Sequence, residues 1–279
     1  MHNRATLFGD SFFTTLRLQS DHILFESSHV SRLLLSAERL GVQLEEKEII
    51  NIFNKIKKDF KAKCTSASAS SAKPSAIVRL QCCVVQGKAG LARDEQAKLV
   101  FDLQYRALDT ASSGGALSVV SCATPVPDFG PVINGLKTTN ALNYVLATKE
   151  WQAVAADEGL MLNHYGHVAE ASFHNVFAWI DDGFWTPSLV HGGVSGIFRD
   201  QLIKLAKEQY IKLSEKPLSS DQLITAAKGL WLANSVRGMR FVSELDQKPI
   251  QYSKQALAFS DLVAERWGQV VAGDRIELC

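Results

Sequence analysis

The chain has 279 residues, of which 46% are hydrophobic and 21% charged, and this balance is enough to bury a large core in one or two domains. Its formal net charge is +1 and it has no long basic block, which excludes the usual charge pattern of proteins that bind nucleic acid or anionic membranes. No apolar run approaches the roughly 20 residues of a membrane-spanning helix, and the first residues do not have the layout of a signal peptide. A folded cytoplasmic protein is therefore expected.

Disulfide and metal chemistry are not indicated. The five cysteines include no C-x-x-C pair and no nearby histidine at metal-ligand spacing, so free and mostly buried thiols are expected. Several histidines are clustered in sequence without matching carboxylates or cysteines, and we interpret them as loop and turn residues. They are His164, His167, His174 and His191.

In chain order, two short extended runs at 11–18 and 23–25 precede a helical pattern over 29–40 that Gly41 closes, which predicts a hairpin followed by a helix. A second helix is predicted over 45–63. It carries the densest basic run, but its apolar residues recur on the opposite face, so the lysines are expected to be a solvated surface. These apolar residues are Ile49, Ile52, Phe53, Ile56 and Phe60.

The small residues of segment 64–74 cannot bury apolar surface and predict a mobile loop. Two apolar strands follow at 76–85 and 98–105. The composition break at 109–115 predicts a linker between a smaller domain, 1–108, and a larger one, 116–279.

The second half alternates predicted strands and helices without an internal repeat. Strands are expected at 117–122, 159–163, 172–180, 184–186, 212–216 and 229–233, and a hairpin around 246–249. Helices are expected at 139–156, 195–209, 219–227 and 253–267. The expected fold class is α+β in two domains.

Three motifs in this half carry chemistry. Lys137 lies in Asn134-Gly-Leu-Lys-Thr-Thr-Asn140, Glu170 ends a Gly-x-Val-x-Glu turn, and Gly193-Val-Ser-Gly-Ile-Phe-Arg199 begins a helix. A lysine, a carboxylate and an anion-binding helix N-terminus can hold pyridoxal phosphate by its aldehyde, ring nitrogen and phosphate, respectively. The sequence therefore favours pyridoxal 5'-phosphate as a cofactor.

Further motifs in the same order resemble the fold-type IV pyridoxal-phosphate enzymes. This family includes branched-chain and D-amino-acid aminotransferases and aminodeoxychorismate lyase. Residues 3–17 are similar to the opening motif of the family, with the R-A-T-x-F-G-D and F-T-T elements of the lyases, and His29-Val-Ser-Arg-Leu33 resembles H-x-x-R-L. The resemblance implies a smaller N-terminal α/β domain, a larger pseudo-barrel domain, a cofactor at the domain interface and a homodimer.

The resemblance also assigns roles to residues. Lys137 falls on the lysine that bonds the cofactor aldehyde and then acts as general base, and Glu170 falls on the glutamate under the ring nitrogen. Arg32 falls on the arginine that binds the cofactor phosphate, which the backbone amides of Ile197 and Phe198 would also face.

Phe198 stands where aminotransferases often have a hydroxyl residue, and Ser195 or Ser235 is the candidate to replace it. The turn Asn234-Ser-Val-Arg-Gly-Met-Arg240 is similar to the N-(S/A)-x-x-G-x-x-P-V of the lyases, with Phe241 in place of the proline.

We therefore expect an aminodeoxychorismate lyase, which converts 4-amino-4-deoxychorismate to 4-aminobenzoate and pyruvate in folate biosynthesis. The alternatives are a class IV aminotransferase of the branched-chain or D-amino-acid type, and a disabled paralogue that only binds the cofactor. The candidate substrate-binding residues are Phe13, Arg93, Asn234 and Arg237.

Two departures from the lyase pattern affect the substrate clamp and the first sheet. In segment 85–93, Gln86 and Leu91 stand where lyases have arginines, which leaves Lys88, Arg93, Arg237 and Arg240 to bind an anionic substrate. The opening strand of the family is expected to be missing before residue 3. Either the start codon is misassigned or a neighbouring strand edge is exposed.

Overall fold

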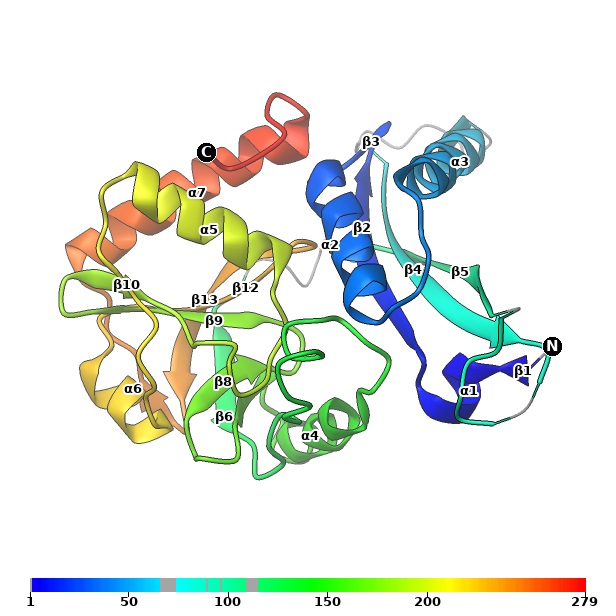
Figure 1. The fold of residues 1–279 in the computed structure, drawn as a ribbon. Coiled ribbons are helices and arrows are strands. Elements are labelled where there is room, and N and C mark those ends of the chain that lie inside the picture. Colours follow the sequence, from blue (N-terminus) through cyan, green and yellow to red (C-terminus); the bar gives the residue numbers. More distant parts are fainter. Residues whose placement is uncertain (1, 66–73, 89, 96, 109–114) are drawn as a thin grey trace. The chain divides into compact units, whose positions relative to one another are not determined.

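The computed structural model describes residues 2–65, 74–88, 90–95, 97–108 and 115–279. The chain forms two compact units (Figure 1). The first comprises Met1–Asp109, Leu136–Asn140 and Val271–Ile276, and the second comprises Thr110–Gly135, Ala141–Val270 and Glu277–Cys279. The expected linker over 109–115, apart from Gly115, and most of the expected mobile loop over 64–74 lie outside the described residues.

The first unit contains an antiparallel sheet in the order β1-β4-β2-β3, with β5 also paired to β4. Its strands are β1 (His2–Asn3), β2 (Ser11–Gln19), β3 (His22–Ile23), β4 (Ser75–Gln86) and β5 (Lys98–Ala107). Its helices are α1 (Arg4–Phe8), α2 (Glu26–Arg39) and α3 (Glu46–Thr65).

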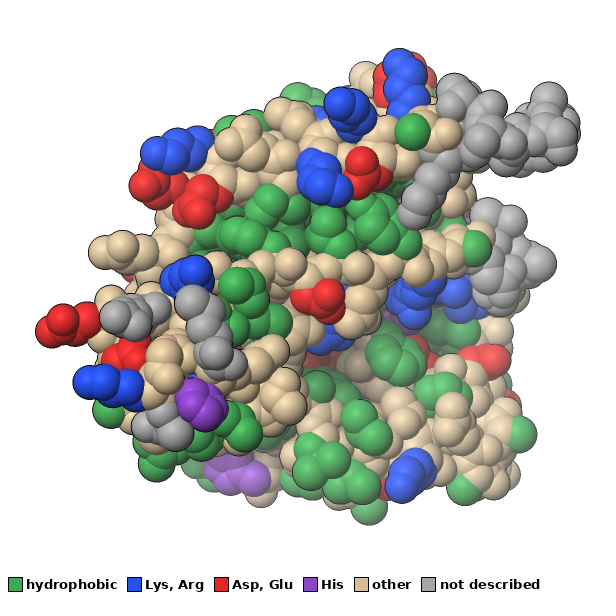
Figure 2. All heavy atoms as spheres, turned by 90° about the vertical axis from the view of Figure 1, so that its right-hand side faces the viewer, with side chains coloured by type: hydrophobic (Ala, Val, Ile, Leu, Met, Phe, Trp, Pro, Cys, Tyr) green, Lys and Arg blue, Asp and Glu red, His purple; other side chains and the backbone are tan. Residues whose placement is uncertain are grey.

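The core of this unit lies between α2, α3 and one face of the sheet. Leu33 of α2, Phe53 of α3 and Leu16 of β2 are fully buried in it. The predicted apolar face of α3 is confirmed, because Ile49, Phe53, Ile56 and Phe60 are core residues. The lysines lie outside: Lys55 pairs with Asp59 at 2.5 Å and Lys57 with Glu26 at 3.0 Å. On the face shown in Figure 2, basic and acidic side chains are interspersed.

Two boundaries differ from the sequence predictions. A short strand, β1, was not predicted from the sequence and pairs His2 with Gln86 and Asn3 with Val85. Helix α1 then begins at an Asn3 cap, since the side chain of Asn3 accepts a hydrogen bond from Thr6 N–H. Phe25 is not extended as predicted. It has a φ of 55° and caps α2, which starts three residues earlier than expected.

The second unit is built on a mixed sheet in the order β11-β10-β9-β12-β13-β6-β7-β8, with β14 paired to β13. Its strands are β6 (Leu117–Ser121), β7 (Glu158–Leu162), β8 (Val168–Ala171), β9 (Asn175–Ile180), β10 (Gly183–Trp185), β11 (Leu213–Ser214), β12 (Leu230–Asn234), β13 (Gly238–Leu245) and β14 (Lys248–Pro249). Its helices are α4 (Leu142–Ala153), α5 (Ile197–Glu208), α6 (Ser220–Ala226) and α7 (Lys254–Ala272), the last two residues of which belong to the first unit.

Helices cover this sheet at separate places (Figure 1). Helix α4 packs on β6 and β7, and α5 meets α7 through an edge-to-face contact of Phe198 with Trp267 at 5.2 Å between ring centroids. The hairpin predicted around 246–249 is confirmed, with Asp246 and Gln247 joining β13 to β14; Asp181 and Asp182 join β9 to β10 in the same way, and all four residues have positive φ.

Two predicted elements in this half were wrong at their ends. The segment before α4 is extended rather than helical, because Thr138 pairs with Phe12 and Thr139 N–H donates to the Ser11 carbonyl. Of the strand predicted over 172–180, only residues 175–180 form a strand, β9, because residues 172–174 turn the chain after β8, where Ala171 N–H donates to the His174 carbonyl.

The cysteine expectation is confirmed for most of the thiols that the structure describes. Cys82, Cys83 and Cys122 are free and buried, whereas Cys279 is free and exposed. Burial raises the pKa of both the Cys82 and Cys122 thiols to about 12, so these two stay protonated.

Candidate active site

The carboxylate of Glu170 is the most enclosed charged group among the predicted site residues. Glu170 is 3% exposed, in the middle of β8. Its Oε1 accepts a hydrogen bond from Tyr144 Oη at 2.5 Å. Its Oε2 accepts bonds from Val194 N–H at 2.9 Å and, more weakly, from Asn175 Nδ2 at 3.4 Å. A buried carboxylate with donors on both oxygens is stabilised in its ionised form.

Glycines allow the Gly193–Gly196 segment to approach this carboxylate and its partner Asn175. Gly193 has a φ of +93°, and a Cβ there would lie 3.5 Å from Glu170 Oε2. A Cβ on Gly196 would lie 1.8 Å from Asn175 Oδ1, a distance that no side chain can occupy. Asn175 Nδ2 also donates to the Val194 carbonyl at 2.9 Å. Gly193 is thus favoured by its left-handed backbone conformation, and Gly196 is required by packing.

The predicted anion-binding turn is the start of α5. Gly196 is its N-cap residue and supplies no capping side chain. Ile197 and Phe198 begin the helix with buried side chains, so these two can contact a phosphate only through their backbone N–H groups. Ser195 N–H donates to the Gly135 carbonyl at 2.9 Å, and Ser235 lies in the turn after β12, 9% exposed.

Lys137 lies in the first unit, on the extended segment beside β2. Its carbonyl accepts a bond from Phe13 N–H at 2.9 Å, and its Nζ is 4.9 Å from the centroid of the Phe13 ring. Phe13 itself is buried. An ammonium group over an aromatic ring is held by the negative face of the ring, so Phe13 positions the amine of Lys137.

A sequence profile of the amino-transferase class IV family matches residues 11–245, which include most strands of both sheets. The chain belongs to the class IV aminotransferase family. Enzymes of this family depend on pyridoxal phosphate. The predicted fold class, a two-domain α+β fold of type IV, is confirmed.

Individual class IV relatives carry both activities that the sequence suggested. A putative branched-chain-amino-acid aminotransferase of Methanocaldococcus jannaschii is 26% identical over 273 residues, which cover 96% of this chain and 89% of that protein. An aminodeoxychorismate lyase of Vibrio harveyi is 21% identical over 244 residues, covering 86% and 85%. The crystal structure of 4-amino-4-deoxychorismate lyase from Pseudomonas aeruginosa has the same fold, with a TM-score of 0.81 at 23% identity over 94% of this chain and 93% of that one.

The residues fit the cofactor of the class IV family. A buried carboxylate with donors on both oxygens suits a protonated ring nitrogen. A helix start without a capping side chain suits a phosphate, and the Lys137 amine supplies the group that bonds an aldehyde. These three assignments remain proposals about this chain.

Arg32 lies half-buried on α2, next to a buried histidine of the same family motif. His29 is fully buried, and its Nδ1 is 2.6 Å from Thr14 Oγ1 of β2. Burial, together with the positive charge of Arg32, holds the pKa of His29 well below 6.5. His29 therefore fixes α2 to the sheet as a neutral side chain, and Arg32 is one turn further along the helix.

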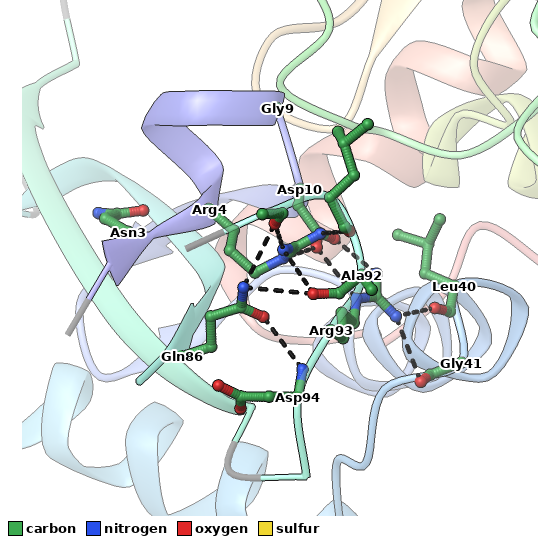
Figure 3. Close-up of polar contacts among 12 residues, drawn as sticks. Asn3, Arg4, Gly9, Asp10, Leu40, Gly41, Gln86, Ala92, Arg93 and Asp94 are labelled. Carbon is green, nitrogen blue, oxygen red and sulfur yellow. Dashed lines mark hydrogen bonds and ion pairs between the residues drawn. The ribbon is translucent and has the colours of Figure 1, made fainter. Parts of the chain in front are cut away.

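Arg93 is committed to the structure of the first unit (Figure 3). Its guanidinium binds both carboxylate oxygens of Asp10, at 2.5 and 3.0 Å, and donates to the carbonyls of Leu40 and Gly41. Arg4 donates to the same Asp10 at 2.7 Å and to the Gly90 and Leu91 carbonyls. Substrate contact by Arg93 would require it to leave these partners.

Gln86 has the same structural role at the base of the loop (Figure 3). Its Nε2 donates to the Lys88 carbonyl at 2.7 Å. Its Oε1 accepts from Asp94 N–H at 3.3 Å. The arginine that lyases have at this position is thus replaced by an amide that closes the loop on itself. The carbonyls of this loop also bind Arg4, so the segment is a structural unit.

One cation near Lys137 escaped the sequence analysis. The guanidinium carbon of Arg79 lies 3.5 Å from the centroid of the Phe13 ring, on the sheet face opposite the core of the first unit. Partial burial lowers the pKa of Arg79, but the guanidinium stays positively charged. The available signal was an arginine between the core residues Val78 and Leu80 of a predicted strand.

The Asn234 turn has a clear physical basis. Asn234 Oδ1 accepts bonds from Val236 N–H at 3.0 Å and Arg237 N–H at 2.9 Å, which closes the turn between β12 and β13. Gly238 follows with a φ of +73°, against the ring of Trp267. The Asn and Gly of the motif are therefore both needed for this hairpin. Phe241, in the usual proline position, packs against Tyr252.

Two arginines project from this hairpin. Arg240 donates to the Gly115 carbonyl at 2.8 Å. Burial and the positive charge of Arg237 hold the pKa of Arg240 below its usual range. Such a pair attracts a substrate with more than one carboxylate.

The clustered histidines fall into two groups. His164 and His191 lie on either side of Asp128, at 3.8 and 3.6 Å from its carboxylate, in surface loops. His174 is buried and pairs through Nδ1 with Glu158 at 3.0 Å. Over the described parts of the chain no three histidine, cysteine or acidic side chains are grouped to hold a metal ion, and no described helix is long and apolar enough to cross a membrane.

Proposed function

We propose that this protein is an aminodeoxychorismate lyase that forms 4-aminobenzoate and pyruvate from 4-amino-4-deoxychorismate. The Asn234 turn carries the proposal. It follows the lyase pattern rather than the threonine-containing turn of aminotransferases, and it carries Arg237 and Arg240 three residues apart on the same hairpin. The substrate has two carboxylates, on its ring and on its enolpyruvyl group, and paired arginines offer the bidentate contacts that carboxylates prefer.

The proposed roles of the residues follow from their positions. When bound, pyridoxal phosphate supplies an aldehyde for the substrate amine and an electron sink for the adjacent carbon. Lys137 removes the proton from the ring carbon that bears the amine and returns a proton to the departing enolpyruvyl group, which leaves as pyruvate. Glu170 keeps the cofactor nitrogen protonated.

Other residues bind rather than react. The helix start at Ile197 and Phe198, with Arg32 and Ser235, binds the cofactor phosphate. Asn234, Arg237 and Phe13 bind the substrate, and Arg79, over the Phe13 ring, adds a cation. Aromatisation makes the elimination strongly favourable, so positioning and charge stabilisation suffice for catalysis. We also propose that the protein acts as a homodimer, as the resemblance implies.

An aminotransferase of the branched-chain or D-amino-acid type is the second candidate. The long match to the Methanocaldococcus jannaschii protein favours it. An aminotransferase must bind an α-carboxylate and accept a second substrate, and Arg79 is suitably placed beside Lys137 and Phe13 for such a carboxylate. A disabled paralogue is the third candidate, favoured by the altered loop at Gln86.

The deciding experiment is 4-aminobenzoate formation by the cofactor-loaded protein given 4-amino-4-deoxychorismate. We expect product from the wild type and none from Lys137→Ala, which should also lose the visible absorption of the bonded cofactor while staying folded. Glu170→Gln should keep the cofactor and form product more slowly. Transfer of an amino group to a keto acid by a wild-type protein that makes no 4-aminobenzoate would establish the aminotransferase instead. Neither activity in a yellow, folded protein would favour the disabled paralogue.

A further inference from the structure

One side of α4 carries two aromatic residues, whose polar tips reach β8 and the residue that follows it. Tyr144, Ala147 and Trp151 follow the spacing of one helix face, and all three pack in the small core formed with Cys122 and Met161. The Oη of Tyr144 donates to Glu170 at 2.5 Å, and the Nε1 of Trp151 donates to Ser172 Oγ at 3.2 Å. The helix thus bonds to Glu170 within β8 and to Ser172 just after this strand.

Only one of these two bonds involves the carboxylate. Glu170 Oε2 is bound by Val194 N–H and Asn175 Nδ2, whereas the Tyr144 hydroxyl binds Oε1. Donors on both oxygens prevent rotation of the carboxylate about its last bond. Burial of Tyr144, and the negative charge of Glu170 beside it, raise the pKa of the phenol far above its usual range. Tyr144 therefore keeps its proton and remains a donor.

We propose that Tyr144 is a positioning residue for Glu170. Its hydroxyl fixes the orientation of the Glu170 carboxylate and stabilises the negative charge there. The proton shared between this carboxylate and the ring nitrogen of bound pyridoxal phosphate then stays on the nitrogen. This inference deepens the proposed function, since it rests on the role of Glu170 there. It does not depend on which amine substrate the enzyme uses.

The consequence of losing the hydroxyl follows from charge balance. Without the Tyr144 donor, the carboxylate of Glu170 becomes more basic and attracts the shared proton more strongly. The ring nitrogen is then less fully protonated and withdraws electrons less well from the reacting carbon. Substrate binding should be spared, because the Tyr144 hydroxyl donates to Glu170 and not to any proposed substrate residue.

The test compares cofactor-loaded wild type with Tyr144→Phe, Trp151→Phe and Glu170→Gln. The visible absorption of bound pyridoxal phosphate is recorded against pH without substrate, and circular dichroism checks the fold. We expect Tyr144→Phe to move the pH midpoint of the absorption band in the same direction as Glu170→Gln, by a smaller amount. Its kcat should fall about tenfold with KM nearly unchanged, as expected for a lost hydrogen bond to a charged group.

Trp151→Phe is the matched control, because it removes the other aromatic donor of the same helix face without touching Glu170. It should leave the band midpoint where it is in the wild type. In the Glu170→Gln background, Tyr144→Phe should have a much smaller effect than in the wild type, since the charge that it stabilises is already absent.

An unchanged midpoint in a folded Tyr144→Phe protein would overturn the inference. So would an equal shift in Trp151→Phe, which would show that the effect comes from movement of the helix. These outcomes are independent of the substrate assay: a wild type that binds cofactor but makes no 4-aminobenzoate would refute the proposed substrate and still allow the spectral comparison to decide the role of Tyr144.

Discussion

His29 shows, at the scale of a residue, how a family motif can combine structural and electrostatic functions. Its ring is fully buried and bonded to Thr14 of the neighbouring strand, one helical turn from Arg32. Burial and the charge of Arg32 hold its pKa well below 6.5, so the folded protein keeps the ring neutral where an unfolded chain would take up a proton. Because only the unfolded chain takes up this proton, the free energy of unfolding depends on pH.

We expect the free energy of unfolding to decrease as the pH falls below about 6.5, because the unfolded state binds a proton at His29 that the folded state refuses. His29→Gln should flatten this part of the profile and cost about 1 kcal/mol at neutral pH through the altered bond to Thr14. Urea unfolding across this pH range measures both effects. The exposed His2→Gln is the control, and identical pH profiles for the two variants would contradict the prediction.

At the scale of elements, α1 and the loop after β4 are joined by a buried charge cluster (Figure 3). Arg4, at the start of α1, is 5% exposed, and Asp10 links it to Arg93. Burial raises the pKa of Asp10, but the hydrogen bonds and charges of Arg93 and Arg4 outweigh burial and hold it below 3.8. The stabilisation is present above 3.8 and is lost as the pH falls through the lowered pKa.

Asp10→Asn should therefore destabilise the protein by about 3 kcal/mol at neutral pH, because it leaves the buried guanidinium of Arg4 without its carboxylate. The difference from wild type should shrink in acid, where the wild-type carboxylate is protonated too. Urea unfolding gives the comparison. Asp59→Asn removes the exposed partner of Lys55 and should cost less than about 1 kcal/mol. A similar cost for both variants would indicate that the cluster around Asp10 is not stabilising.

At the scale of the whole molecule, the chain contains two units with separate cores. The segment with Lys137 belongs to the first unit although the sequence places it after the first strand of the second. Glu170 and its partners Tyr144, Asn175 and Val194 belong to the second unit, as does the start of α5. A cofactor that binds the folded chain and not the unfolded one stabilises it by mass action.

Pyridoxal phosphate at a hundred times its dissociation constant should raise the free energy of unfolding by about 2.7 kcal/mol. Thermal unfolding with and without the cofactor measures this increase. Lys137→Ala should show a smaller increase at the same concentration, since it loses the bond to the aldehyde. No stabilisation of the wild type at any concentration would contradict the assignment of the cofactor site.

Several features of this protein follow from its sequence alone. The apolar spacing of Phe53 and its neighbours predicts the buried face of α3, and the residues around 246–249 predict the hairpin of β13 and β14. The motifs around Lys137 and Glu170 identify the family because residues close in sequence carry the chemistry. In each case the signal is local: helix periodicity, turn geometry and short motifs depend on neighbours a few residues apart.

Only the tertiary structure decided which distant partners the polar side chains have. The sequence suggested Arg93 as a substrate-binding residue, but its guanidinium binds Asp10. Arg79 was predicted only as part of a strand, and its guanidinium lies over the Phe13 ring. Tyr144 carried no signal in the sequence, yet its hydroxyl binds Glu170. A charged or hydroxyl side chain finds its partner through strand register and helix packing, which depend on the whole chain, so local pattern cannot specify it.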